Sequence, residues 1–124
     1  MGNRKQTVVV LGASPKPARY SNQALRLLDE AGYRVIPVHP RVESIEGLPV
    51  SAGLTLIDEP VHTLTLYVGE ARSTPMIPDI VGLNPHRVIF NPGSESEQLE
   101  QKLRAHHIEV IHGCTLVMVR TNQF

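Results

Sequence analysis

Short apolar runs rich in β-branched residues recur along this chain, and helical patterns fill most of the intervals between them. The first run, Val8-Val9-Val10-Leu11, is continuous rather than alternating, which is typical of a strand buried on both faces of a sheet. Similar runs give five predicted strands in all: 7–11, 33–38, 64–68, 87–90 and 108–111. Strands that alternate with helices at this spacing form right-handed βαβ units. The pattern therefore predicts an α/β fold, a Rossmann-like three-layer sandwich with a five-stranded, mainly parallel sheet.

Two of the intervals between the strands carry clear helix signals. In the first, Ser21 has the residue type of an N-cap, and Gly32 supplies a C-terminal stop. An apolar stripe at helical spacing lies between them: Ala24, Leu25, Leu27, Leu28 and Ala31. The second helix is predicted to begin at Ser94 or Ser96.

The remaining intervals are less regular. Residues 74–83 form a poorer helical pattern, because Pro78 is tolerated only in a first turn. A helix there must therefore start late. Residues 41–60 are predicted to be a loop with one short strand near 54–57.

Length and charge limit the class of protein. The 124 residues fit one domain, which we expect to span 1–124. Twelve basic residues balance twelve acidic ones, so the totals offer no electrostatic footprint for nucleic acid. No apolar segment approaches the ~20 residues of a membrane-spanning helix, and no membrane partner is expected. The single cysteine, Cys114, allows no intrachain disulfide and is typical of a cytoplasmic protein, while self-association into a homo-oligomer stays open.

The loop after the first strand carries the clearest chemistry. In parallel sheets, ligands bind at the carboxyl ends of the strands, and Gly12 lets the backbone turn sharply there. Free amide groups at the start of the following helix attract phosphate. Ser14 adds a hydroxyl group, and Lys16 and Arg19 add positive charge. The loop predicts a phosphate site, with a solvated proline-rich connection as the alternative.

This loop does not match the dinucleotide fingerprint G-x-G-x-x-G, because Gly12 is its one glycine. The fingerprint also expects an acidic residue after the second strand, to bind the ribose hydroxyls. Here the second strand ends in Val38-His39-Pro40-Arg41, which contains a cation and no carboxylate. A cation at that place suits a nucleotide with an additional ribose phosphate, as in NADP or coenzyme A (CoA), and disfavours NAD.

Several motifs, in their order along the chain, resemble the family of stand-alone CoA-binding proteins. They are Gly12-Ala13-Ser14-x-Lys16-Pro17-x-Arg19, Val35-Ile36-Pro37-Val38-x-Pro40, Asn91-Pro92-Gly93 and the late Cys114. The resemblance covers about 5–119, and the fold of that family resembles the N-terminal CoA-binding domain of the succinyl-CoA synthetase α subunit. It implies that the chain binds CoA or an acyl-CoA through the first strand–helix loop, as a non-catalytic or regulatory module.

The resemblance also implies which residues contact the cofactor. Those at the pyrophosphate and the helix start are Gly12, Ala13, Ser14, Lys16, Pro17, Arg19 and Asn22. Those beside the adenosine and its ribose phosphate are Val38, His39, Pro40 and Arg41. The facing wall and the next strand end supply Tyr67, Val68, Gly69, Asn91, Pro92 and Gly93. The loop from Gly69 to Arg72 lacks the proline of the synthetases, and their phosphorylated histidine lies outside this module, so no ligase activity is implied.

No catalytic constellation can be identified in the sequence. His106, His107, His112 and Cys114 lie close together, but their spacing does not match a zinc site. Cys114 is expected to be a small buried residue. Besides the CoA-binding module, two hypotheses stay open: an NADP-binding reductase-like protein, and an interaction subunit without a tightly bound ligand.

Overall fold

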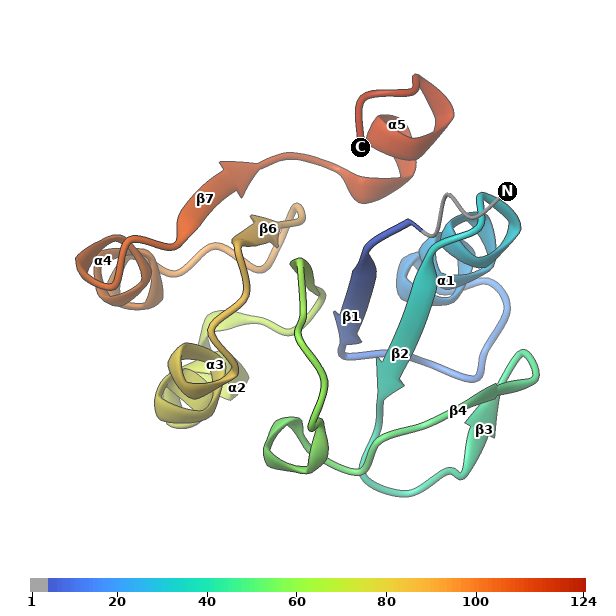
Figure 1. Cartoon of the computed structure of the whole chain (residues 1–124), viewed down its shortest axis with the longest axis horizontal. Coiled ribbons are helices and arrows are strands. Elements are labelled where there is room, and N and C mark those ends of the chain that lie inside the picture. Colours follow the sequence, from blue (N-terminus) through green and yellow to red (C-terminus); the bar gives the residue numbers. More distant parts are fainter. Residues whose placement is uncertain (1–4) are drawn as a thin grey trace.

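The computed structural model describes residues 5–124 and contains a five-stranded sheet with the strand order β2-β1-β5-β6-β7 (Figure 1). The strands are β1 Thr7–Leu11, β2 Arg34–Val38, β5 Thr63–Leu66, β6 Arg87–Phe90 and β7 Glu109–His112. Every pairing within this sheet is parallel, which confirms the predicted Rossmann-like α/β fold. The strand order reverses beside β1, which has β2 on one side and β5 on the other. The carboxyl ends of β1 and β5 are therefore the place where such folds bind ligands.

Side chains of strand β1 alternate between two apolar clusters, one on each face of the sheet. The helices are α1 Tyr20–Glu30, α2 Glu70–Ser73, α3 Ile77–Leu83, α4 Glu97–Ala105 and α5 Thr115–Arg120. Val8 and Val10 pack with residues of α1, whereas Val9 and Leu11 pack with residues of α3 and α4. In Figure 1, α1 and α5 lie on one side of the sheet and α2, α3 and α4 on the other. A strand buried on both faces needs an apolar residue at every position, which explains the continuous run.

The two predicted helix starts have different outcomes. The N-cap prediction for Ser21 is wrong: Arg19 occupies the N-cap position, without a side-chain hydrogen bond, and Ser21 is buried in the first turn. A preceding turn, in which Arg19 N donates to Lys16 O at 3.1 Å, starts the helix earlier. The prediction for Ser96 is confirmed, because Leu99 N donates to Ser96 Oγ at 3.2 Å.

The segment after β2 is more structured than predicted. The strand predicted near 54–57 is wrong, because Leu54–Leu56 is a 3₁₀ turn, η1. A strand would place Leu54 and Leu56 on one face, whereas their side chains are 7% and 68% exposed, so only the first joins the core. Before η1, a small hairpin pairs β3 (Ser44–Ile45) with β4 (Leu48–Pro49).

The chain after this hairpin returns to the outer edge of β2. Ser51 N donates to Pro37 O at 2.9 Å, and His39 N donates to Ser51 O at 3.1 Å. These bonds hold the loop after β2 in place beside the carboxyl end of the sheet.

The last two helical regions complete the fold. Residues 70–83 form α2, a 3₁₀ turn η2 (Thr74–Met76) and α3, whose first turn contains Pro78, so this helix starts late as expected. Helix α5 was not predicted. Cys114 takes its N-cap position and is half-buried rather than buried, so the expectation for this side chain is wrong. Among the described helices, none is long and apolar enough to cross a membrane.

Candidate functional site

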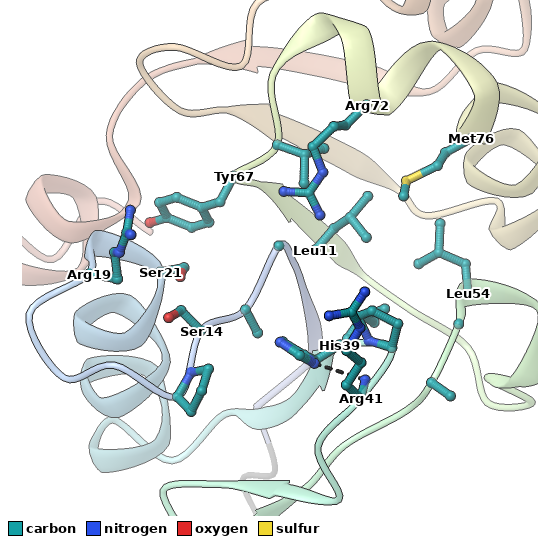
Figure 2. Close-up of a pocket in the computed structure, with 18 of the residues that line it drawn as sticks. Leu11, Ser14, Arg19, Ser21, His39, Arg41, Leu54, Tyr67, Arg72 and Met76 are labelled. Atoms are coloured by element: carbon teal, nitrogen blue, oxygen red, sulfur yellow. Dashed lines mark hydrogen bonds between the residues drawn. The ribbon is translucent and has the colours of Figure 1, made fainter.

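A cavity of about 840 Å³ opens at the carboxyl ends of β1, β2 and β5 (Figure 2). Its volume is in the range of small-molecule sites. The predicted site residues that line it are Gly12, Ala13, Ser14, Lys16, Arg19, Val38, His39, Pro40, Arg41, Tyr67, Val68 and Pro92. The predicted residues outside its lining are Pro17, Asn22, Gly69, Asn91 and Gly93. The lining residues that we did not predict are Leu11, Pro15, Tyr20, Ser21, Ala52, Gly53, Leu54, Arg72, Met76 and Asp79.

Gly12 sits where the loop after β1 packs against the loop after β5. Its φ of +90° is a conformation that L side chains rarely adopt. A Cβ atom there would lie 2.9 Å from Val68 Cγ1 and 3.1 Å from the backbone carbon of Tyr67. The glycine is therefore required by the packing of two loops, in addition to any approach of a ligand.

The side chain of Asn22 fixes the conformation of the loop after β1 by hydrogen bonds. Its Nδ2 atom donates to Ser14 O at 2.9 Å and to Glu46 Oε2 at 3.1 Å, and its Oδ1 atom accepts from Arg26 Nε at 2.8 Å. Arg26 also donates to Pro17 O at 2.9 Å. Because Asn22 is fully buried and all its polar atoms are bonded, Asn22 and Pro17 shape the loop and do not line the cavity.

Positive charge lines the cavity and is not neutralised. Lys16, Arg19, Arg41 and Arg72 are exposed, and their own side chains make no hydrogen bond or ion pair within residues 5–124. The one carboxylate in the lining is Asp79. In Figure 2 the Arg72 side chain extends from α2 toward the centre of the cavity, and Arg41 lies on the opposite wall. The site is therefore suited to an anionic ligand.

The imidazole of His39 is oriented by the backbone of Arg41, two residues later in the chain. Its Nδ1 atom accepts a hydrogen bond from Arg41 N at 3.0 Å. The neutral imidazole then carries its proton on Nε2. His39 can consequently offer a donor to a ligand in addition to the nearby arginine.

The two ends of the cavity differ in polarity. Leu54 and Met76 lie at one end, with Leu11 beside them, and Ser14 and Arg19 lie at the other (Figure 2). Leu54 belongs to η1, which precedes β5 in the sequence, and Met76 belongs to η2, which follows β5. The cavity can thus hold a molecule with an apolar ring system at one end and polar groups at the other.

Tyr67 forms part of the wall near the polar end. Its hydroxyl oxygen is buried and has no hydrogen-bond partner among the described residues. Desolvation by burial raises the pKa of Tyr67 to about 12. The hydroxyls of Thr115 and Thr65 lie close enough to oppose this pKa shift, but neither meets hydrogen-bond geometry with the phenol.

A buried polar network lies below the cavity at the ends of β5 and β6. Asn91 Nδ2 donates to Thr65 Oγ1 at 2.7 Å and to Leu66 O at 2.9 Å, and Asn91 Oδ1 accepts from Thr115 N at 2.9 Å. Thr65 and Thr115 share a further hydrogen bond of 2.7 Å. The side-chain amide of Asn91 is thus occupied by the protein, and the network ties α5 to the sheet.

The histidines near the end of the chain serve other contacts. No group of three His, Cys, Asp or Glu side chains in the described chain has the arrangement of a metal site. His106 Nδ1 lies 2.9 Å from Lys102 O, and His112 Nε2 lies 2.7 Å from Glu100 Oε1. The hydrogen bond from His112, followed by that from Arg104, holds the pKa of Glu100 below its usual value.

The site residues that sequence reasoning missed come mainly from 52–54 and 72–79. Arg72 belongs to the short helix α2, where an arginine is more often solvated than bound to a ligand, so its position in the sequence gave no distinguishing signal. Leu54 and Met76 gave no signal of their own, because an apolar residue in an irregular segment has the same appearance in a core and in a pocket wall.

Comparison with known proteins agrees with this geometry. A family model described as a CoA binding domain matches residues 6–120. A stretch of 64 residues is 30% identical to uncharacterized protein YneT of Bacillus subtilis, covering 52% of this chain and 47% of YneT. The match thus spans about half the length of that curated relative.

Solved structures show the same fold. The structure of cell-free ID.343 from Thermus thermophilus is 30% identical, with a TM-score of 0.88, over 96% of this chain and 90% of that chain. Acetyl-coenzyme A synthetase 1 of Ca. Korarchaeum cryptofilum is 19% identical, with a TM-score of 0.76, over 89% of this chain and 26% of that chain. The second likeness shows the fold alone. Because the family model covers most of its length, this chain belongs to the CoA-binding domain family.

Proposed function

We propose that this chain binds CoA or an acyl-CoA in the cavity, with the loop after β1 at the pyrophosphate, as a one-domain module that is non-catalytic or regulatory. The unpaired cations of the lining carry the proposal: Lys16, Arg19, Arg41 and Arg72. CoA carries a pyrophosphate and a ribose 3′-phosphate, and phosphate accepts strong charge-assisted hydrogen bonds from such side chains.

The polarity of the cavity supports one orientation of the ligand. Adenine suits the end formed by Leu54 and Met76, because its faces are apolar. The ribose phosphate then lies within reach of Arg41 and Arg72, and the pyrophosphate lies at the amide groups after Gly12. The pantetheine arm continues from the pyrophosphate along the polar end of the cavity, past Tyr67.

Titration calorimetry with CoA and dephospho-CoA tests the assignment of Arg41. We expect CoA to bind about fivefold more tightly, since an exposed charge–phosphate contact contributes about 1 kcal/mol. Arg41→Gln should reduce that difference, whereas Arg120→Gln, the same change on α5 outside the cavity, should preserve it. Equal affinities for the two ligands in the parent protein would refute the role of Arg41.

A thermal-shift panel separates the proposal from its alternatives. At a concentration one hundred times its Kd, a ligand stabilises the fold by about 2.7 kcal/mol, which raises Tm by about 10 °C for a chain of this size. We expect that shift for CoA or acetyl-CoA. A larger shift with NADP would favour the reductase-like hypothesis, and no shift with any nucleotide would favour the interaction subunit.

Two observations support a module without turnover. Cys114 does not line the cavity, and the lining contains no nucleophile bonded to a histidine or carboxylate base. Acetyl-CoA incubated with the protein should therefore remain intact by mass spectrometry, and Cys114→Ser should leave CoA affinity unchanged. Release of free CoA, or loss of affinity in Cys114→Ser, would contradict this part of the proposal. The cytoplasmic location and any self-association stay predictions.

A further inference from the structure

The phenol of Tyr67 is a hydrogen-bonding group that the folded chain leaves without a partner. Its oxygen is covered, and no donor or acceptor of residues 5–124 bonds to it. The nearby hydroxyls of Thr65 and Thr115 are bonded to each other at 2.7 Å, and Thr65 also accepts from Asn91. Burying an unsatisfied hydroxyl destabilises a fold. A ligand that supplies the missing acceptor would remove that penalty.

The direction of this hydroxyl defines where such an acceptor would lie. Tyr67 lines the cavity, and in Figure 2 its oxygen points toward the side of Arg19 and Ser21, away from Leu54. Arg19, on the same side, is exposed, and its side chain has no partner within the described chain. The hydroxyl therefore belongs to the polar end of the cavity.

The chemistry of the phenol selects the kind of acceptor. Burial raises the pKa of Tyr67 to about 12, so the hydroxyl keeps its proton at physiological pH and is a donor. A neutral acceptor matches a covered, desolvated donor, because a charged one would have to lose its hydration there. Beyond the pyrophosphate, the neutral oxygen acceptors of CoA are the two amide carbonyls and the hydroxyl group of its pantetheine arm, and an amide carbonyl is the stronger acceptor of the two kinds.

We infer that Tyr67 donates a hydrogen bond to a carbonyl oxygen of the pantetheine arm, which makes the polar end of the cavity a subsite for the arm. This inference rests on the proposed CoA binding. It assigns Tyr67 to the part of the ligand that a bare nucleotide lacks. An acyl-CoA adds a thioester carbonyl to the amide carbonyls of the arm, and either kind provides the same acceptor chemistry.

The test compares a ligand that has the arm with one that lacks it. Calorimetry would measure CoA, acetyl-CoA and adenosine 3′,5′-bisphosphate against the parent protein, Tyr67→Phe and Tyr33→Phe. The last variant is a matched control, because Tyr33 packs against Phe124 and does not line the cavity. Tyr67→Phe should weaken CoA binding by about three- to tenfold and leave the bisphosphate unchanged. Its unfolding midpoint without ligand should stay the same or rise, since the unpaired hydroxyl is gone.

Each outcome has a separate meaning. A larger loss for acetyl-CoA than for CoA would place the thioester carbonyl at Tyr67, and equal losses would place an amide carbonyl there; both support the inference. Unchanged CoA affinity in Tyr67→Phe, or an equal loss for the bisphosphate, would overturn it while leaving the proposed function intact. A parent protein that binds neither CoA nor the bisphosphate would overturn the proposed function itself, and this inference with it.

Discussion

Gly12→Ala tests whether the approach of two loops, rather than loop conformation alone, shapes the cavity. An L residue at a left-handed φ costs about 1–2 kcal/mol, and φ is +90° at this position. The new methyl group would lie 2.9 Å from Val68 Cγ1 and 3.1 Å from the backbone carbon of Tyr67. Relieving such an overpacked contact costs a further 1–3 kcal/mol or so. We therefore expect a total loss of about 2–5 kcal/mol in the free energy of unfolding.

Gly32→Ala separates the two contributions. Gly32 has a nearly identical φ of +93°, but a Cβ atom there would meet nothing within 4 Å. Its substitution should cost the conformational part alone, about 1–2 kcal/mol. Equilibrium unfolding in urea, followed by circular dichroism, measures both variants against the parent. If Gly12→Ala loses no more stability than Gly32→Ala, the contact with the loop after β5 contributes nothing and the reasoning is refuted.

Three further predictions concern the cavity, the buried network and pH. Arg72→Gln should weaken CoA binding about three- to tenfold and reduce its salt dependence, because Arg72 is an unpaired cation of the lining; an equal loss in Arg120→Gln, outside the cavity, would contradict this. Asn91→Leu should lower the free energy of unfolding by about 2–4 kcal/mol in urea titrations, because the Thr115 amide loses its buried acceptor; a neutral effect would contradict the network. Burial, followed by nearby positive charge, lowers the pKa of His62 in the folded state. The unfolded chain therefore binds more protons below about pH 6.5, so stability falls as pH drops below that value. His62→Gln should reduce this slope in urea titrations from pH 7 to pH 5, and an unchanged slope would contradict the assignment.

The sheet was predictable because its signal is local and redundant. Strands β1, β2 and β6 contain continuous apolar runs, and a strand covered on both faces cannot be mistaken for an amphipathic one. Ser96 was predictable for the same reason, since a cap is defined by a few neighbouring residues. The start of the first helix was not, because turn bonding between Lys16 and Arg19 decided it rather than the side chain of Ser21.

Only those cavity residues that directly follow a strand of the sheet could be predicted from the sequence. Gly12, Ser14 and Lys16 follow β1 directly, so the sheet topology places them at the site. Leu54 precedes β5 in the sequence and Met76 follows it. Whether the two side chains lie at the same end of the cavity depends on the path of two irregular segments. No pattern within either segment reports that path. The unpaired phenol of Tyr67 is likewise invisible in sequence, because its isolation depends on the hydroxyls around it.

The contact between Ser51 and β2 has a consequence for self-association through strand edges. An exposed edge strand is a template for pairing with another chain. On β2, Ser51 already occupies the outward carbonyl of Pro37 and the outward amide of His39, and Pro37 has no N–H to offer. A strand from a second molecule would find an interrupted ladder there. Aggregation through this edge is thereby discouraged, and within the described chain strand addition is directed to β7, which pairs with β6 alone.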